Sequence, residues 1–136
     1  MKIERHIISA SVPDFRKIFF FLFLEILFCN TSVFSQEKEN IIKAGIASYY
    51  SDCFNGRRTA SGEIFRQEQF TCASNHFELG TRLKVINTKN GKSAIVKVND
   101  RLGKGVNRIV DLTRAAAEKI GMITIGLVSV TVEKIK

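Results

Sequence analysis

Histidine and cysteine are scarce in this chain of 136 residues, and their scarcity excludes several kinds of site. The chain contains two histidines and three cysteines. Only His76 follows the N-terminal segment 1–35, so a histidine-rich metal site is excluded in the remainder. Cys53 and Cys72 lack the spacing of a zinc-binding pair. We therefore expect no metal and no cofactor, and we interpret His76 as a loop or surface residue.

A long hydrophobic run is also missing. The apolar run at residues 18–28 is too short for a comfortable transmembrane helix and is interrupted by Glu25. Basic residues precede this run and small residues follow it, which is typical of an export signal. We predict that residues 1–35 are a signal peptide cleaved after Ser35. The mature protein is then exported to the periplasm, the cell envelope or the medium.

Cys29 follows the apolar run, where the lipid-bearing cysteine of a lipoprotein would lie. The residue before it is Phe28, whereas lipoprotein processing needs a small side chain at that position. We therefore expect ordinary cleavage and no lipid anchor at Cys29.

Proline occurs once in the chain, and neither a Pro/Ser-rich linker nor an internal repeat divides the sequence. The length allows one domain at most. The polar stretch "QEKEN" follows the predicted signal. We predict a short polar tether at residues 36–43 and one domain at residues 44–136.

Positive charge is in excess: the formal net charge is +8, and residues 1–35 contribute only one unit of it. No basic helix and no basic patch interleaved with aromatic residues stands out, so we do not expect nucleic acid as a partner. An exported basic protein meets other polyanions, such as cell-wall polymers, lipid head groups and anionic glycans. Alternatively, the excess of lysine only keeps a small protein soluble.

The two cysteines beyond the signal, Cys53 and Cys72, form an even pair in an oxidising compartment, which predicts one disulfide. Closing a loop of about twenty residues would add on the order of 3 kcal/mol of stability. The alternative is two unlinked cysteines.

The remaining pattern is one of strands and turns. Segments 81–87 and 93–99 flank Asn90-Gly91, which is a strong hairpin signal because both residues tolerate positive φ. In the second segment alternate residues, beginning with Ala94, share one face. Residues 126–135 alternate more clearly, with the three valines of that segment on the inner face.

One helix is convincing. Thr113 can cap the start of "RAAAEKI", and Gly121 occupies the position of a left-handed C-terminal residue. Two turns are too short to be stable alone, so this helix must pack on β structure. Many short strands with one short helix predict a mainly β fold, a small closed barrel.

Three acids lie at the ends of predicted elements: Glu63, Asp100 and Asp111. A carboxylic acid can protonate a leaving oxygen while a second group stabilises the developing charge. A structural interpretation is equally available. Glu63 lies near two arginines in the sequence, Asp100 adjoins Arg101, and Asp111 precedes a helix N-terminus that favours an acid.

Three motifs carry a resemblance: "GIASYYSDCFNGRRTASGEIF", "GTRLKVINTKNGKSAIVKVNDR" and "RIVDLTRAAAEKIGM". In this order they resemble the rare lipoprotein A family of septal peptidoglycan lytic transglycosylases, from Gly45 to Glu133. The resemblance implies a six-stranded double-psi β-barrel, shared with expansin and family 45 endoglucanases. It also implies a protein that cleaves peptidoglycan glycan strands between N-acetylmuramic acid and N-acetylglucosamine, leaving a 1,6-anhydro end. We expect a monomer. No glycan-binding repeat is expected after the barrel.

The resemblance assigns the two catalytic carboxylates to Glu63 and Asp100, with Asp100 as the acid that protonates the glycosidic oxygen. It also implies a set of substrate-binding residues: Ser48, Tyr50, Thr59, Ser74, Asn99, Arg101 and Asp111.

The chain departs from the family at two places in this groove. Ser74 replaces a family histidine, and the loop after Arg101 differs from the family's "N-D-R-G-P". The alternative function is therefore a non-catalytic, expansin-like module that binds or loosens wall polysaccharide. A third interpretation is a barrel in which all the acids are structural.

Overall fold

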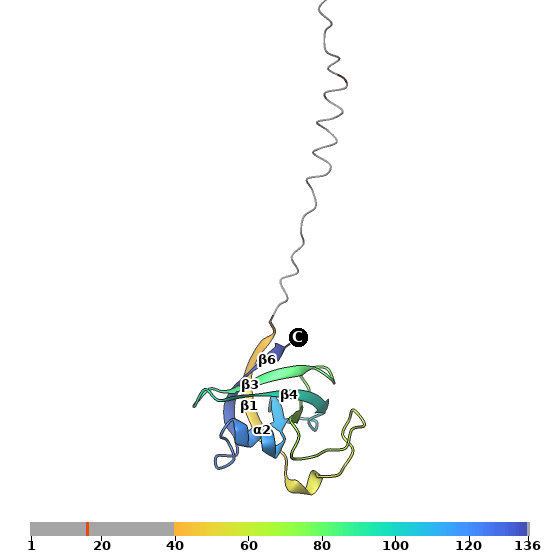
Figure 1. Ribbon diagram of the computed structural model, residues 1–136, viewed down its shortest axis with the longest axis vertical. Coiled ribbons are helices and arrows are strands. Elements are labelled where there is room, and N and C mark those ends of the chain that lie inside the picture. Colours follow the sequence, from red (N-terminus) through yellow and green to blue (C-terminus); the bar gives the residue numbers. More distant parts are fainter. Residues whose placement is uncertain (1–15, 17–39, 136) are drawn as a thin grey trace, which may run out of the picture. The chain divides into compact units, whose positions relative to one another are not determined.

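Six strands, a 3-10 turn and a short helix make up the part of the chain that the computed structural model describes, Arg16 and residues 40–135 (Figure 1). The elements are β1 (Ile42–Tyr49), η1 (Asp52–Phe54), β2 (Thr71–Ala73), β3 (Arg82–Asn87), β4 (Ser93–Asp100), β5 (Val110–Leu112), α2 (Arg114–Lys119) and β6 (Val128–Ile135). Within this part, no helix is sufficiently long and apolar to span a membrane. The predicted signal peptide, its cleavage after Ser35 and the lipidation question at Cys29 lie outside the described residues.

The strands close into a barrel in the order β1-β5-β2-β4-β3-β6, with β6 paired back onto β1. Two pairs are parallel, β1 with β5 and β2 with β4, and the other four are antiparallel. Parallel neighbours need long crossovers. Residues 50–109 connect β1 to β5, and residues 74–92 connect β2 to β4. This closed, mainly β barrel with one helix confirms the predicted fold class.

The β3–β4 hairpin is confirmed, with Ile86 paired to Ser93. Its turn is longer than two residues, because Asn87 N donates to Lys92 O at 2.8 Å. Within this turn only Gly91 has a positive φ, +73°. Asn90 instead binds the end of the helix, since its Nδ2 donates at 3.0 Å to the carbonyl of Ile120, just after α2.

Alternation along the strands produces the core. Burial in β6 alternates as predicted, with its valines inside the barrel, and in β4 it alternates up to Val98. Leu83, Val96 and Val130 are at most 1% exposed. The small side chains of Ala116 and Ala117 on α2 are also fully buried, so the helix packs closely against the barrel.

The predicted helix is present, although its cap differs in detail. Thr113 occupies the N-cap position, but its hydroxyl donates to Gln69 O rather than to the helix. Gly121 adopts the predicted left-handed conformation, with φ of +70°. At the other end of the domain the boundary needs correction, because β1 begins at Ile42. The barrel therefore begins two residues before the predicted domain start at residue 44. The last two residues of the predicted tether at 36–43 belong to β1.

The predicted disulfide between Cys53 and Cys72 is wrong, because both thiols are free. Cys72 lies on β2 with no exposed surface and belongs to the hydrophobic core, whereas Cys53 is exposed on η1. Burial also raises the pKa of the Cys72 thiol.

These surroundings predict a difference in cysteine reactivity. Iodoacetamide is expected to modify Cys53 in the native protein and to modify Cys72 only after denaturation, because the reagent needs an accessible thiolate. Peptide mapping by mass spectrometry distinguishes the sites. A peptide pair linked through Cys53 and Cys72, or equal native labelling of both, would contradict the structure.

Candidate active site

Three of the predicted site residues lie in one row across the barrel. Ser48 of β1 pairs with Asp111 of β5, Asp111 pairs with Ala73 of β2, and Ala73 pairs with Asp100 of β4. Neighbouring strands lie about 4.8 Å apart, so the backbones of Asp100 and Asp111 are separated by roughly 10 Å. Strands far apart in the sequence thus bring two acids and a hydroxyl to one region.

A β-bulge sets the direction of Asp100. Cys72 pairs with Val98, but the next residue of β2 pairs with Asp100, so Asn99 is an extra residue on β4. A bulge bends a strand and re-aims the side chains that follow it. Val96 and Val98 point into the core, while Asp100 is half-buried at the end of the strand.

The Asp100 carboxylate accepts three hydrogen bonds. The Tyr50 hydroxyl donates to Oδ2 at 2.6 Å, and the backbone N–H groups of Ala60 and Arg101 donate to Oδ1 at 2.9 Å each. Burial raises the pKa of Tyr50, and the neighbouring Asp100 raises it further. Tyr50 therefore keeps its proton at neutral pH and acts as a fixed donor to the carboxylate.

The loop that carries Glu63 docks on the end of β4. Thr59 N donates to Glu63 O at 2.8 Å, and Gly62 N donates to Thr59 O at 2.9 Å, which closes a tight turn. Gly62 has a φ of +88°, which favours glycine. Ser61 N then donates at 3.0 Å to Asn99 O, so the turn is fixed beside the bulge.

The Glu63 carboxylate is held in its ionised form. Lys97 Nζ lies 2.7 Å from Oε1, and Asn99 Nδ2 donates to Oε2 at 3.4 Å. The hydrogen bond from Lys97 is the main cause that lowers the pKa of Glu63 below its ordinary value. An ionised, exposed carboxylate stabilises positive charge or accepts a proton, but it is a poor proton donor at neutral pH.

Asp111 forms a bidentate ion pair that the sequence did not reveal. Arg108 Nε and Nη2 donate to the two carboxylate oxygens at 2.7 and 2.9 Å. The Asp111 side chain is only 15% exposed. Its carboxylate therefore orients Arg108 at the rim of the row.

The side chains of four other predicted substrate-binding residues form hydrogen bonds within the protein. Ser74 has no exposed surface, and its hydroxyl donates to Ile109 O at 2.8 Å. Arg101 Nη1 donates to the carbonyls of Ser74 and Phe77. Thr59 and Asn99 are 8% and 2% exposed. Both form hydrogen bonds to Glu63.

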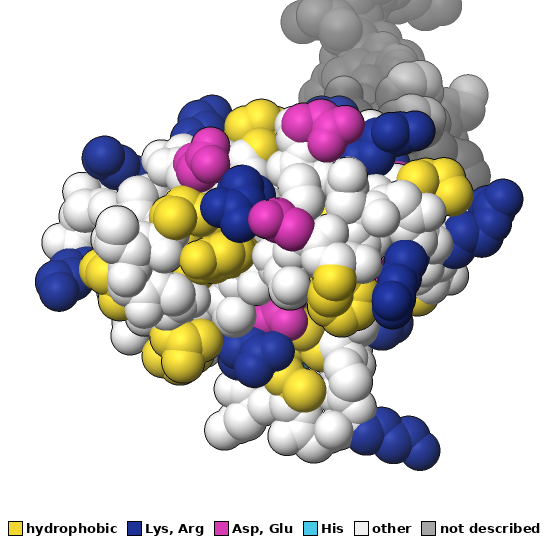
Figure 2. Space-filling model, turned by 90° about the horizontal axis from the view of Figure 1, so that it is seen from below, with side chains coloured by type: hydrophobic (Ala, Val, Ile, Leu, Met, Phe, Trp, Pro, Cys, Tyr) yellow, Lys and Arg dark blue, Asp and Glu magenta, His cyan; other side chains and the backbone are white. Residues whose placement is uncertain are grey.

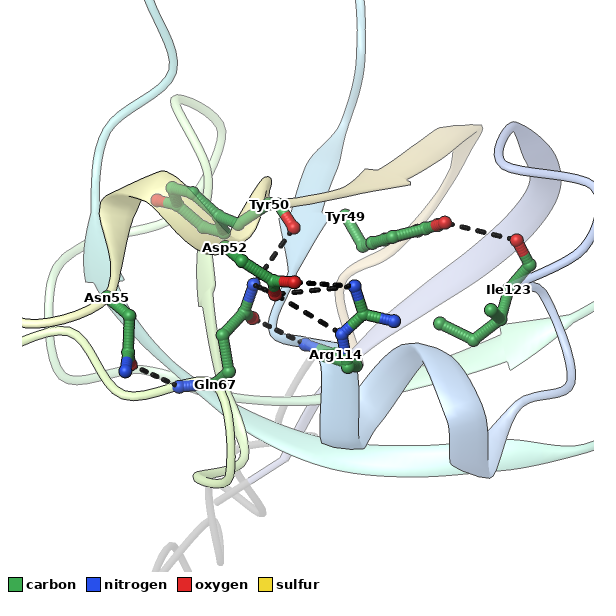
Figure 3. A network of polar contacts seen from close by, with 7 residues as sticks. All are labelled: Tyr49, Tyr50, Asp52, Asn55, Gln67, Arg114 and Ile123. Atoms are coloured by element: carbon green, nitrogen blue, oxygen red, sulfur yellow. Dashed lines mark hydrogen bonds and ion pairs between the residues drawn. The ribbon is translucent and has the colours of Figure 1, made fainter.

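A polar network behind Tyr50 was missed altogether (Figure 3). Gln67 Nε2 donates to Tyr50 O at 3.0 Å and to Asp52 Oδ1 at 3.1 Å, and Gln67 Oε1 accepts from Arg114 N at 2.8 Å. Asp52 also pairs with the Arg114 guanidinium at 3.1 Å. Gln67 thus ties the end of β1 to the start of α2 and fixes the backbone of Tyr50. In the sequence "FRQEQF" nothing distinguishes it from a surface residue.

A cavity of about 460 Å³ adjoins this network, and its lining includes Ser48, Tyr49, Tyr50, Arg114 and Leu127. It offers hydroxyl groups, a guanidinium and apolar surface. Neither Asp100 nor Glu63 lines it, but Tyr50 connects it to Asp100 through the 2.6 Å hydrogen bond. Within the described part of the chain, no group of three or more His, Cys, Asp or Glu residues is arranged to hold a metal ion.

Comparisons with known sequences agree with the barrel and its motifs. The family model described as lytic transglycolase matches residues 42–132. The endolytic peptidoglycan transglycosylase RlpA of Neisseria meningitidis serogroup A is 43% identical over 93 residues, which cover 68% of this chain and 39% of that protein. The protein of the same name from Haemophilus influenzae is 39% identical over 103 residues, covering 76% and 36%. This chain therefore spans little more than a third of the length of these relatives.

Solved structures show the same fold at lower sequence identity. An expansin of Clavibacter michiganensis superposes with a TM-score of 0.58 at 19% identity, covering 71% of this chain and 51% of that chain. The Streptomyces papain inhibitor superposes with a TM-score of 0.57 at 21% identity, covering 71% and 96%. The barrel is thus a double-psi β-barrel, as the sequence predicted.

The contacts of Gln67 predict its contribution to stability. Gln67→Met keeps the side-chain size but removes three hydrogen bonds, and we expect the free energy of unfolding to fall by about 1–2 kcal/mol. Gln69→Met is the matched control, because the Gln69 side chain has no hydrogen bond within the described residues. Urea denaturation measures both. An equal effect of the two variants would contradict the assigned role of Gln67.

The Lys97 contact predicts the titration of Glu63. Carbon-13 NMR of the side-chain carboxyl is expected to give a pKa below the ordinary 4.5, and Lys97→Met is expected to raise it. Since the folded-state pKa is lowered, the pair stabilises the fold above the unfolded-state pKa. This contribution is lost as the pH falls through the folded-state pKa. An unchanged titration in Lys97→Met would show that Lys97 is not the cause.

Proposed function

Because the chain belongs to the lytic transglycolase family, we propose that it is an exported endolytic lytic transglycosylase of peptidoglycan. In this reaction the bond between the anomeric carbon of N-acetylmuramic acid and the oxygen of N-acetylglucosamine breaks. The 6-hydroxyl of the same muramic residue bonds to that carbon, which gives a 1,6-anhydro end. No water and no covalent enzyme intermediate are needed, since the nucleophile is already tethered to the reacting sugar.

One observation carries the proposal: the loop that carries Glu63 docks directly on the end of β4, where Asp100 lies. Ala60 N donates to the Asp100 carboxylate at 2.9 Å, and Ser61 N donates to Asn99 O at 3.0 Å. These bonds hold two carboxylates from distant parts of the sequence at the same end of β4. Enzymes that cleave glycosidic bonds commonly use two carboxylic acids that lie in different surroundings.

Asp100 is the proton-transfer group in this proposal. In its acid form it protonates the leaving glycosidic oxygen, and its carboxylate then accepts the proton released by the 6-hydroxyl, so the proton balance closes. The Tyr50 hydroxyl and the two backbone N–H groups fix the orientation of Asp100 during both steps. Tyr50 itself does not transfer a proton, because its raised pKa keeps it protonated.

Glu63 has the complementary role. Its ion pair with Lys97 keeps it negative, so it stabilises the positive charge that develops on the muramic ring as the leaving group departs. The opposite assignment, with Glu63 as the acid, would require a proton that the adjacent ammonium group of Lys97 disfavours.

The cavity next to the site supports binding to a polar, anionic polymer. On the face seen from below, basic and acidic side chains are interspersed with hydrophobic ones (Figure 2). The neighbouring cavity combines the Tyr49 ring and Leu127 with hydroxyl groups and Arg114. Sugar rings have an apolar face and polar edges, and such a mixed surface suits both.

Replacement of the acid gives the main test. Asp100→Asn keeps the size and most contacts but removes the transferable proton, and the rate is expected to fall by about 10²–10⁴-fold. Glu63→Gln is expected to lower the rate as well. Glu68→Gln is the control, because Glu68 is an exposed acid with no ion pair within the described residues. Mass spectrometry of products from purified peptidoglycan measures anhydro ends.

The same experiment separates the enzyme from a binding module. Anhydro products that disappear in Asp100→Asn and persist in Glu68→Gln support the transglycosylase. No products from the wild-type protein, together with retained sedimentation with the wall, would identify a barrel that binds polysaccharide without cleaving it.

A further inference from the structure

A second cavity, of about 390 Å³, lies beside the first half of β1 and the segment before β5. Its lining includes Lys43, Gly45, His76, Arg108 and Ile109. Neither the predicted catalytic residues nor the network of Figure 3 contribute to it. The cavity is thus separate from Glu63 and Asp100, and its lining differs from theirs in charge.

The cavity is cationic. Lys43 and Arg108 line it, and no acidic residue does. Arg108 uses Nε and Nη2 to hold Asp111, and its Nη1 has no hydrogen bond among the described residues. Lys43 has no ion pair there, and its Nζ lies 5.9 Å from the centroid of the Phe77 ring. N–H donors of both side chains therefore remain for an anion.

The floor of the cavity is built into the barrel. Ile109 N donates to Ile46 O at 2.9 Å, which fixes the lining segment on β1. A Cβ at Gly45 would lie 2.9 Å from Ile109 Cβ, so only glycine allows this close approach. The shape of the cavity therefore does not depend on a movable side chain at that position.

The cavity connects with the catalytic row through one ion pair. Arg108 lines the cavity and holds Asp111, and Asp111 lies in register with Ala73, the partner of Asp100. Two strand spacings separate Asp111 from Asp100, roughly 10 Å. An anion bound to Arg108 would thus be linked to the row of Asp111 and Asp100 through this ion pair.

We propose that this cavity is a subsite for a carboxylate carried by the glycan strand, a specificity that rests on the proposed function. In peptidoglycan only the muramic sugar carries a lactyl group. Its carboxylate is free in stripped strands, and in intact strands it is amide-linked to a stem peptide that has carboxylates of its own. N-acetylglucosamine has none. A charge on every second sugar lets Lys43 and Arg108 fix the register of the strand, so that the bond after a muramic residue meets Asp100.

Three chemically matched strands test the proposal. The first is stripped of stem peptides and has free lactyl carboxylates. The second is the same strand after its carboxylates are converted to methylamides. The third keeps its stem peptides. Rates of anhydro-end formation at low substrate concentration and equilibrium binding of end-labelled strands are both measured at low ionic strength. The proteins are the wild type, Lys43→Gln and the control Lys84→Gln, which removes an exposed lysine outside this cavity.

The expected result is a loss of selectivity. Wild-type protein prefers a carboxylate-bearing strand to the methylamide strand, and Lys43→Gln lowers that preference about threefold, as expected for one exposed ion pair. Lys84→Gln leaves it unchanged. A preference lost for the first strand identifies the lactyl carboxylate as the occupant. A preference lost for the third identifies a carboxylate of the stem peptide.

The two proposals fail separately. Equal cleavage and equal binding of charged and neutral strands by the wild type would overturn the carboxylate subsite and leave the transglycosylase intact. An equal loss of selectivity in Lys43→Gln and Lys84→Gln would overturn it too, because general electrostatic attraction would then explain the preference. Absence of products with charge-selective binding that depends on Lys43 would instead support the subsite and overturn the proposed activity.

Discussion

The hydrogen bonds to the Asp100 carboxylate are the interaction on which the site depends. Through them the end of β1, the Glu63 turn and the start of the crossover after β4 meet at one side chain. A carboxylate can accept several hydrogen bonds at once, because it has two acceptor oxygens. An amide or a hydroxyl has only one acceptor oxygen and cannot replace it fully. Asp100 is therefore a structural junction as well as the proposed proton-transfer group, and this explains why an acid at a strand end, inside a basic loop, need not be a simple turn residue.

In the proposed function, different electrostatic surroundings give the two acids different roles. Glu63 lies beside a lysine that keeps it negative, whereas Asp100 is held by neutral donors from Tyr50 and the backbone. Different neighbours give similar carboxylates different chemistry. The third acid, Asp111, forms a bidentate ion pair with Arg108. The proposed carboxylate subsite extends this arrangement, because Asp111 turns an arginine toward the strand to be recognised.

Most of the fold could be predicted from local patterns, since alternation, the hairpin glycine and the helix-terminal residues act over a few neighbours. The parts that failed depend on distant contacts. The bulge at Asn99 is hidden because "VKVND" reads as ordinary alternation, and Arg108 and Gln67 look like surface residues. The disulfide failed because an even cysteine count does not show which way Cys72 points. For the site, the motifs placed Glu63 and Asp100, but only tertiary packing shows that Ser74 is buried.

The strand order has a consequence for folding. The short strand β2 lies between β4 and β5, which follow it in the chain, and β1 pairs with β5 and β6. Contacts of such large sequence separation slow folding, because loops must close before the pairing stabilises them. The row that joins β1, β5, β2 and β4 can form only when the barrel is nearly complete. A partly folded chain therefore has no assembled site.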